Sequence, residues 1–202
     1  LVLRLLSGDP IDPTVLAEQL PFLNRGGNIQ LILMQLDNIH KLEQETGKIE
    51  LLMLSPSILS ILQEVIRQYA QGIIAEIGGG EFVILVSFEG RNSQQYFWNV
   101  SRQLVQSLRQ NLEKYTNLTA SFALGKLVQQ PSSLPGCYRQ TRQEMSLRYL
   151  TGHSSLIDVS ENRSPDPEKF VTLDAASEKQ IANAVEHRDR ERCMTDVQAV
   201  FD

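Results

Sequence analysis

The chain has 202 residues, of which 42% are hydrophobic and 21% are charged, values that are ordinary for a globular domain. Its formal net charge of -5 at pH 7 argues against direct nucleic-acid contact by this chain, because phosphate binding needs clustered Lys and Arg. No apolar run reaches membrane-spanning length and no signal peptide is present, so we expect a cytoplasmic domain. Because the sequence does not begin with Met, we expect it to be part of a longer protein, which could itself be anchored to a membrane.

The cysteine and histidine residues indicate neither a disulfide framework nor a metal site. Cys137 and Cys193 lie far apart and form no CxxC motif, which fits a reducing cytoplasm. His40, His153 and His187 lack the spacing of metal ligands. We therefore expect no metal and no other cofactor.

Residues 1–27 are predicted to form an N-terminal helical connector. The first six residues, LVLRLL, are mostly apolar and are typical of the end of a helix. Asp12 followed by Pro13 indicates a helix N-cap and its first helical position. Leu16, Leu20 and Leu23 then line one face of this short helix, with a proline near its end.

A domain is predicted over residues 28–160, and it begins with a strand. In residues 28–36, Ile29, Leu31 and Leu33 alternate with Ile32 and Met34, so both faces of the strand are apolar. This pattern predicts a central strand that is covered on both sides. Residues 37–47 are predicted to form a short helix that stops at a glycine.

A longer helix and a hairpin follow. We expect this helix to begin at Ser55-Pro56 and to stop at Gly72. The run IIAEIGGGEFVILVSF, residues 73–88, has two β-branched and aromatic segments around consecutive glycines, which predicts a β-hairpin. The helix has an apolar stripe formed by Ile58, Leu62, Val65 and Tyr69.

The rest of the domain alternates helices and strands. Asn92 or Ser93 is expected to open a long amphipathic helix. Residues 118–128 and 155–159 are predicted strands, and a helix after Pro131 runs to Gly152 between them. The long helix has its apolar residues at steps of three and four: Phe97, Val100, Leu104, Leu108, Leu112 and Tyr115.

Residues 161–169 contain two prolines among polar residues, so they are predicted to form a linker. Residues 170–202 are predicted to form two amphipathic helices that join at Arg188-Asp189. Such short helices are marginal alone, so they need each other or a neighbouring domain.

The signature turn Gly78-Gly79-Gly80-Glu81-Phe82 resembles the GGDEF hairpin of diguanylate cyclases with its third position altered. The order βααββαβαβ over residues 28–159 also fits that family. The resemblance implies an α+β fold, the palm of GGDEF and nucleotidyl-cyclase domains. Its central sheet would be mostly antiparallel, with about five strands flanked by helices, and the C-terminal helical pair would follow it.

The sequence differs from the family's pattern at the positions that carry out the chemistry. The two carboxylates that hold divalent metal in the cyclases align with Gln35 and Gly80, so neither is present. The remaining acids, Asp37 and Glu81, are interpreted as structural, and we predict no catalytic residue, no metal site and no cyclase activity. Positions that contact guanine, phosphate or product in the family also differ: Glu43, Leu52, Tyr149, Tyr69 and Gly72.

The chain is most similar in outline to the degenerate GGDEF-like middle domain of multidomain bacterial AraC-type transcription regulators. The features that carry this resemblance are the Leu5-Leu6-Ser7-Gly8 segment, the proline-bearing linker and the two helices after it. It implies neighbouring sensor or receiver and helix-turn-helix domains in the same polypeptide, and DNA binding only through that parent protein.

The sequence suggests three functions: a catalytically inactive signalling domain, a nucleotide or small-molecule sensor that uses the degenerate cyclase cleft, and an active cyclase. Gln35 and Gly80 disfavour the third, and Leu52 favours the first over the second, because a purine edge would face an apolar side chain. The apolar N-terminal segment and the C-terminal helices could pack within the chain or form a homodimer.

Overall fold

The computed structural model describes residues 1–24, 27–37, 39, 48–88, 93–146 and 154–158, and the side chains of residues 48–53 are outside this description. The chain divides after Glu161, and all described residues belong to the first unit, Leu1–Glu161. The expected linker and helical pair of residues 161–202 therefore lie outside the described residues. Within the described part, no helix is both long and apolar enough to cross a membrane.

From residue 28 onward, the described elements agree with the predicted order of strands and helices, while the short helix expected over residues 37–47 lies outside the described residues except for residues 37 and 39. The described elements are α1 (Val2–Ser7), α2 (Pro13–Gln19), the 3-10 turn η1 (Pro21–Asn24), β1 (Asn28–Leu36), α4 (Lys48–Tyr69), β2 (Gln71–Gly78), β3 (Glu81–Phe88), α5 (Gln94–Thr116), β4 (Ala120–Val128), the 3-10 turn η2 (Pro131–Ser133), α6 (Leu134–Met145) and β5 (Leu156–Asp158).

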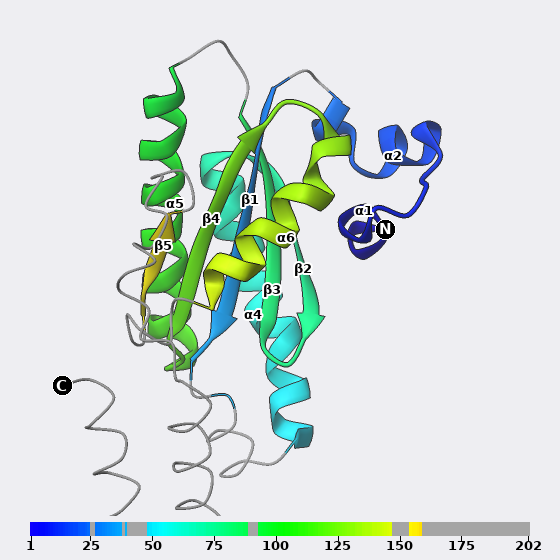
Figure 1. Cartoon of the computed structure of the whole chain (residues 1–202). Coiled ribbons are helices and arrows are strands. Elements are labelled where there is room, and N and C mark those ends of the chain that lie inside the picture. The colour runs from blue at the N-terminus through cyan, green and yellow to red at the C-terminus, as the bar shows by residue number, and fades with distance from the viewer. Residues whose placement is uncertain (25–26, 38, 40–47, 89–92, 147–153, 159–202) are drawn as a thin grey trace, which may run out of the picture. The chain divides into compact units, whose positions relative to one another are not determined.

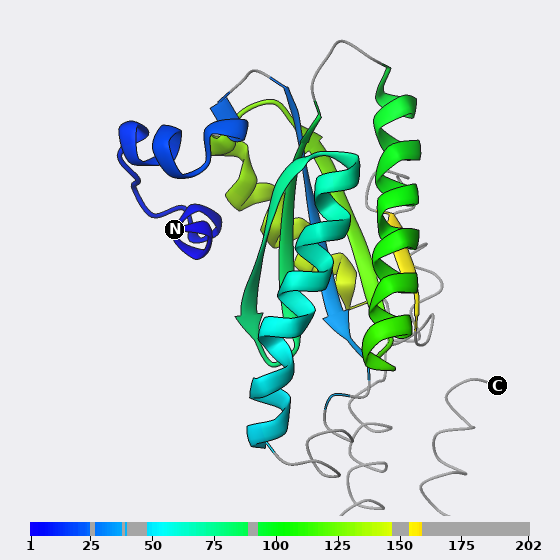
Figure 2. The ribbon, with the colours of Figure 1, turned by 180° about the vertical axis from the view of Figure 1, so that it is seen from behind.

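One five-stranded sheet forms the centre, with the strand order β2-β3-β1-β4-β5. The pairs β2-β3, β3-β1 and β1-β4 are antiparallel, and β5 runs parallel to β4. Figures 1 and 2 show the two faces: α6 crosses one face, and α4 and α5 cover the other. The predicted α+β class with a mostly antiparallel sheet of five strands is thus confirmed.

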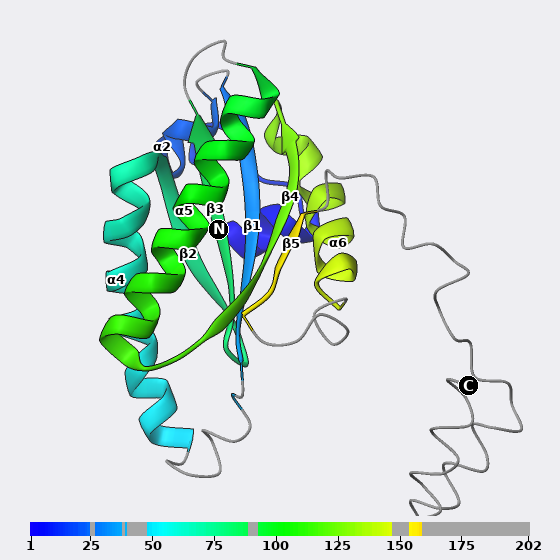
Figure 3. The ribbon, with the colours of Figure 1, turned by 90° about the vertical axis from the view of Figure 1, so that its left-hand side faces the viewer.

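The alternating strand of residues 28–36 is β1, and it lies in the middle of the sheet as predicted. Ile29, Leu31 and Leu33 pack into the core on the α6 side, to which α1 and η1 also contribute. Ile32 and Met34 pack into the core under α4 and α5. Figure 3 shows β1 between these helix layers. Both faces are apolar because both are covered.

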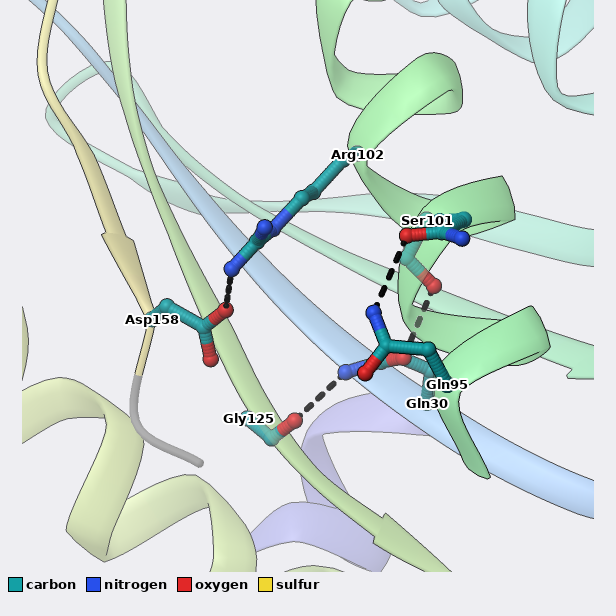
Figure 4. A network of polar contacts seen from close by, with 7 residues as sticks. Gln30, Gln95, Ser101, Arg102, Gly125 and Asp158 are labelled. Atoms are coloured by element: carbon teal, nitrogen blue, oxygen red, sulfur yellow. Dashed lines mark hydrogen bonds and ion pairs between the residues drawn. The ribbon is translucent and has the colours of Figure 1, made fainter. Parts of the chain in front are cut away.

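The helix α5 packs on the sheet through its apolar face. Polar contacts fix it there as well (Figure 4). The buried Gln30 of β1 accepts a hydrogen bond from Ser101 Oγ of α5 at 2.8 Å and donates one to the carbonyl of Gly125. That carbonyl lies at an irregularity in the pairing of β1 with β4, so the Gln30 amide satisfies an acceptor where the ladder is interrupted. Arg102 of α5 forms an ion pair with Asp158 of β5 at 2.8 Å.

Two predicted boundaries of the long helix before the hairpin are wrong. The helix α4 already includes Lys48, and Pro56 lies inside it rather than at its start. Ser55 does not cap the helix, since its hydroxyl bonds to Glu76 Oε1 of β2. Gly72 does not end the helix either but belongs to β2, where a Cβ would lie only 2.6 Å from the carbonyl oxygen of Leu85. Glycine at position 72 thus allows the backbones of β2 and β3 to pack closely.

Other boundaries are closer to the prediction. Asp12 caps α2 by accepting a hydrogen bond from the Thr14 N–H, and Ser93 caps α5 in the same way from the Tyr96 N–H. The helix α2 stops at Gln19, because a 3-10 turn begins at the proline that follows Leu20. Tyr115 was expected on the apolar stripe of α5, but it is 60% exposed because it lies in the last turn, beyond the sheet.

Candidate functional site

The signature turn joins β2 to β3 as the sequence predicts. Gly78, Gly79 and Gly80 all have positive φ, at 118°, 61° and 73°. Glycine adopts this region without steric cost, and two such residues in succession are typical of a tight hairpin turn. Gly78 pairs with Glu81 across the turn, and the register of the two strands shifts between Glu76 and Gly78.

The turn lies against the end of β1. The Leu36 N–H donates to the carbonyl of Gly80 at 2.9 Å, and Gln35 is the register partner of Glu81. The fold therefore brings together the two positions, 35 and 80, at which the resemblance expects metal-binding carboxylates. The side chains present there are an amide and a hydrogen atom.

Ile39 fills the space beside Gly80. A Cβ built on Gly80 would clash with Cδ1 of Ile39 and would lie 3.3 Å from the Cβ of Leu36. Gly80 and Ile39 are both buried, whereas a Cβ on Gly79 would meet nothing within 4 Å. A longer side chain at position 80 thus needs Ile39 to move. Sequence reasoning placed Ile39 only within an expected helix and missed this contact.

The first remnant acid, Asp37, is buried and holds three parts of the sheet together. Its carboxylate accepts a hydrogen bond from Ser121 Oγ of β4 at 2.8 Å and another from the Ser154 N–H, just before β5, at 3.0 Å. The Asp37 N–H in turn donates to the carbonyl of Thr119. The side chain therefore orders the start of β5 against β4.

The second remnant acid, Glu81, lies on the face of the sheet that α6 covers. Its Oε1 is 3.7 Å from Nε of Arg142 on α6, and its side chain is 16% exposed. Burial raises the pKa of the neighbouring Tyr138, and the Glu81 carboxylate raises it further while Arg142 opposes this. Phe82, the next signature residue, is fully buried in the core under α4 and α5.

The described residues contain no group of three or more His, Cys, Asp or Glu side chains that could hold a metal ion. Of the other family positions, Tyr69 bonds through its hydroxyl to Ser107 Oγ at 2.6 Å, and Gly72 lies within β2. Glu43, Tyr149 and the side chain of Leu52 lie outside the described residues.

Two surface pockets lie away from the signature turn. One, of about 350 Å³, includes Tyr69 at the end of α4, Phe88 at the end of β3 and Tyr96 in the first turn of α5. The other, of about 320 Å³, is lined by residues of α1 together with Ile73 and Ala75 of β2. No residue of the signature turn lines either of these two pockets.

Several solved structures of GGDEF domains have a fold similar to that of this chain. A microbial GGDEF domain described with cyclic di-GMP is 18% identical, with 78% of this chain and 90% of that chain covered and a TM-score of 0.49. The active GGEEF domain of a diguanylate cyclase from Vibrio cholerae is 14% identical, with 74% and 90% covered and a TM-score of 0.47. The GGDEF domain of YfiN (TpbB) from Pseudomonas aeruginosa is 12% identical, with 79% and 92% covered and a TM-score of 0.48.

No curated protein matches this chain. The family model described as a GGDEF-like domain matches residues 23–146, which is more than half of the chain. That range includes β1, the hairpin with its signature turn, α5, β4 and α6. The chain belongs to the GGDEF-like domain family.

Proposed function

We propose that this chain is a catalytically inactive GGDEF-like domain that relays a signal within a larger bacterial regulator. The observation that carries the proposal is the pair of positions 35 and 80, which lie next to each other and offer no carboxylate. A cyclase of this family needs acidic groups to hold divalent metal, which neutralises the triphosphate and orients the attacking hydroxyl.

The residues present do not fit a divalent metal at this place. Mg²⁺ prefers carboxylate and phosphate oxygens in near-octahedral geometry, and Gly80 supplies no side-chain ligand. A side chain at position 80 would also have to displace Ile39, whose Cδ1 atom clashes with a Cβ built on Gly80. The loss therefore involves packing around the turn as well as the missing charge.

The two remaining acids support the same proposal, because each is engaged elsewhere. The carboxylate of Asp37 accepts hydrogen bonds from Ser121 and Ser154, and Glu81 faces Arg142 of α6. A carboxylate that is hydrogen-bonded in the interior is costly to withdraw, because its former donors stay buried without partners. We infer that Asp37 serves the fold through these bonds, and we propose the same for Glu81 from its ion pair with Arg142, which is a weaker contact.

For the parent protein, we propose an AraC-type transcription regulator. In it this domain would lie between an upstream sensor or receiver domain and a downstream helix-turn-helix domain. The support is the sequence alone: the Leu5-Leu6-Ser7-Gly8 segment, a linker over residues 161–169 and a helical connector over residues 170–202. DNA contact would belong to the parent, and signal relay would act through the geometry of a homodimer.

Two measurements test this function. The first is incubation of the chain with GTP and Mg²⁺, for which we expect no cyclic di-GMP by chromatography; product above a no-protein control would contradict the proposal. The second is a calorimetric titration with GTP and with cyclic di-GMP, each with Mg²⁺. We expect no heat, whereas saturable binding would favour a sensor that uses the degenerate cleft.

A variant pair makes the activity test sharper. Gln35→Asp alone restores one carboxylate, and Gln35→Asp combined with Gly80→Asp restores both. We expect both variants to stay inactive, because Ile39 crowds position 80 and the positions that contact guanine and phosphate in the family also differ. Cyclic di-GMP formation by the double variant alone would show that missing charge, and not packing, is what prevents catalysis.

A further inference from the structure

The strand β2 is an edge of the sheet, and α4 packs along it. We propose that Gln63 of α4 blocks the free edge of β2 against pairing with the β2 edge of a second copy of this chain. The proposal rests on the hydrogen bonds of one side chain, on the glycine that lets it reach the edge, and on the composition of the strand.

Gln63 bonds to the backbone groups that an added strand would use. Its Nε2 donates to the carbonyl of Gly72 at 3.0 Å, and its Oε1 accepts from the Ile74 N–H at 3.3 Å. In a parallel sheet, a residue on one strand bonds to a carbonyl and to an N–H on the two sides of one residue of its neighbour. The Gln63 amide bonds to β2 in the same way, on the two sides of residue 73. While the amide stays there, another strand cannot make those bonds.

Gly72 allows α4 to come close enough for this contact. A Cβ at position 72 would lie 2.8 Å from Cγ1 of Val86 and 3.0 Å from Cγ2 of Ile66, which belongs to α4. A second polar contact lies farther along the same strand, where the Ser55 hydroxyl of α4 bonds to Glu76. Ser55 and Gln63 are eight residues apart, about 12 Å along a helix, so α4 is fixed to β2 at two points.

The sequence of β2 explains why a block is needed. The strand QGIIAEIG contains no Lys, Arg or Pro, the residues that commonly protect an edge, and its single charged side chain, Glu76, is bonded to Ser55. Ile73, Ala75 and Ile77 are partly buried, because their side chains pack against the core on the α6 side, to which α1 contributes. Two such edges can pair antiparallel about a two-fold axis, because each offers the same surface to the other. A second copy is therefore the partner that the free edge fits.

The test compares Gln63→Met with the wild-type chain by sedimentation over a range of concentrations. Met keeps the length of the side chain and loses the amide, so we expect a species of twice the wild-type mass to appear as concentration rises. In dilute solution, we expect the Ile74 amide to exchange its hydrogen about tenfold faster. Unchanged mass together with unchanged exchange in a folded variant would overturn the proposal.

Three further variants keep the outcome interpretable. Gln63→Asn retains a polar surface but is one methylene short, so it should associate even if the Met variant fails to fold. Gln63→Met with Ala75→Lys places a charge on the edge and should remain at the wild-type mass. Association that persists in this double variant, or that appears equally in the control Gln106→Met on the exposed face of α5, contradicts a β2 interface.

Discussion

The Cδ1 methyl group of Ile39 lies where a Cβ atom on Gly80 would be, so a side chain at position 80 requires Ile39 to shift. Gly80→Asp, which restores the acidic third position of the signature, should therefore destabilise the chain. We expect a loss of about 2–4 kcal/mol, from the positive φ of 73° and from overpacking against Ile39. Urea unfolding followed by circular dichroism would measure this loss as a lower midpoint with an unchanged slope.

The neighbouring glycine provides the control for that prediction. Gly79 also has a positive φ, 61°, but a side chain there would meet nothing within 4 Å. Gly79→Asp should lose only about 1 kcal/mol, since only the backbone is strained. Equal losses for the two variants would mean that Ile39 moves aside freely, and the packing argument for position 80 would be wrong.

The buried carboxylate of Asp37 should matter for stability. Asp37→Asn keeps the shape of the side chain but replaces one oxygen by an NH₂ group. The asparagine therefore cannot accept hydrogen bonds from both Ser121 Oγ and the Ser154 N–H in the present geometry. Hydrogen bonds to a charged group contribute about 1.5–3 kcal/mol, and we expect a loss in that range. Chemical denaturation measures it, with Asp9→Asn after α1 as a control that is expected to change little, because the hydrogen bond from Ser7 Oγ to Asp9 is exposed to water. No difference between these variants would contradict a structural role for Asp37.

Much of the sheet could be predicted because its signals are local. The alternation in residues 28–36 gives β1 to the residue, and the glycines at 78–80 give the hairpin. The start of α4 could not be predicted in this way. Pro56 is a common first residue of a helix, but here Leu54 before the proline and Ile58 after it pack against the same core, so the helix continues on both sides of Pro56.

In the candidate site, too, the residues could be predicted from the sequence but their contacts could not. Its residues could be found in the sequence, because the glycine turn and the end of β1 carry recognisable motifs. The partners of these residues could not be found in this way. Asp37, for example, bonds to Ser121 and Ser154, which lie 84 and 117 positions away from it in the sequence. Contacts at such separations depend on the register of several strands, which no local pattern determines.

The Gln30–Ser101 pair offers a test of how α5 is held to the sheet. Ser101→Ala leaves the buried Gln30 Oε1 without this donor, and we expect a loss of about 1–3 kcal/mol. In the double variant Gln30→Leu with Ser101→Ala, the total loss should be smaller than the sum of the two single losses, by about 1 kcal/mol. A double-mutant cycle from urea unfolding measures this coupling. Strict additivity would show that the two side chains do not interact in solution.

The buried thiol of Cys137 predicts how stability depends on alkaline pH. Burial raises the pKa of this thiol above its ordinary value of 9.0, although the hydrogen bond with Thr141 and the positive charge of Lys126 oppose the shift. In the unfolded chain the thiol ionises at lower pH than in the folded chain. Its contribution to stability is therefore fully present below about pH 9 and is lost as pH rises above that value.

We expect the free energy of unfolding to fall from about pH 9 upward, and to fall less steeply in Cys137→Ala. The raised pKa of Tyr138 acts in the same direction, so the variant should keep part of the alkaline loss. Urea unfolding at pH 7, 9 and 10 gives both slopes. The difference between slopes is the informative quantity, because the truncated side chain also lowers stability by an amount that does not depend on pH. Parallel slopes would mean that the thiol ionises equally well in the folded and unfolded chains, and so would contradict its burial between β4 and α6.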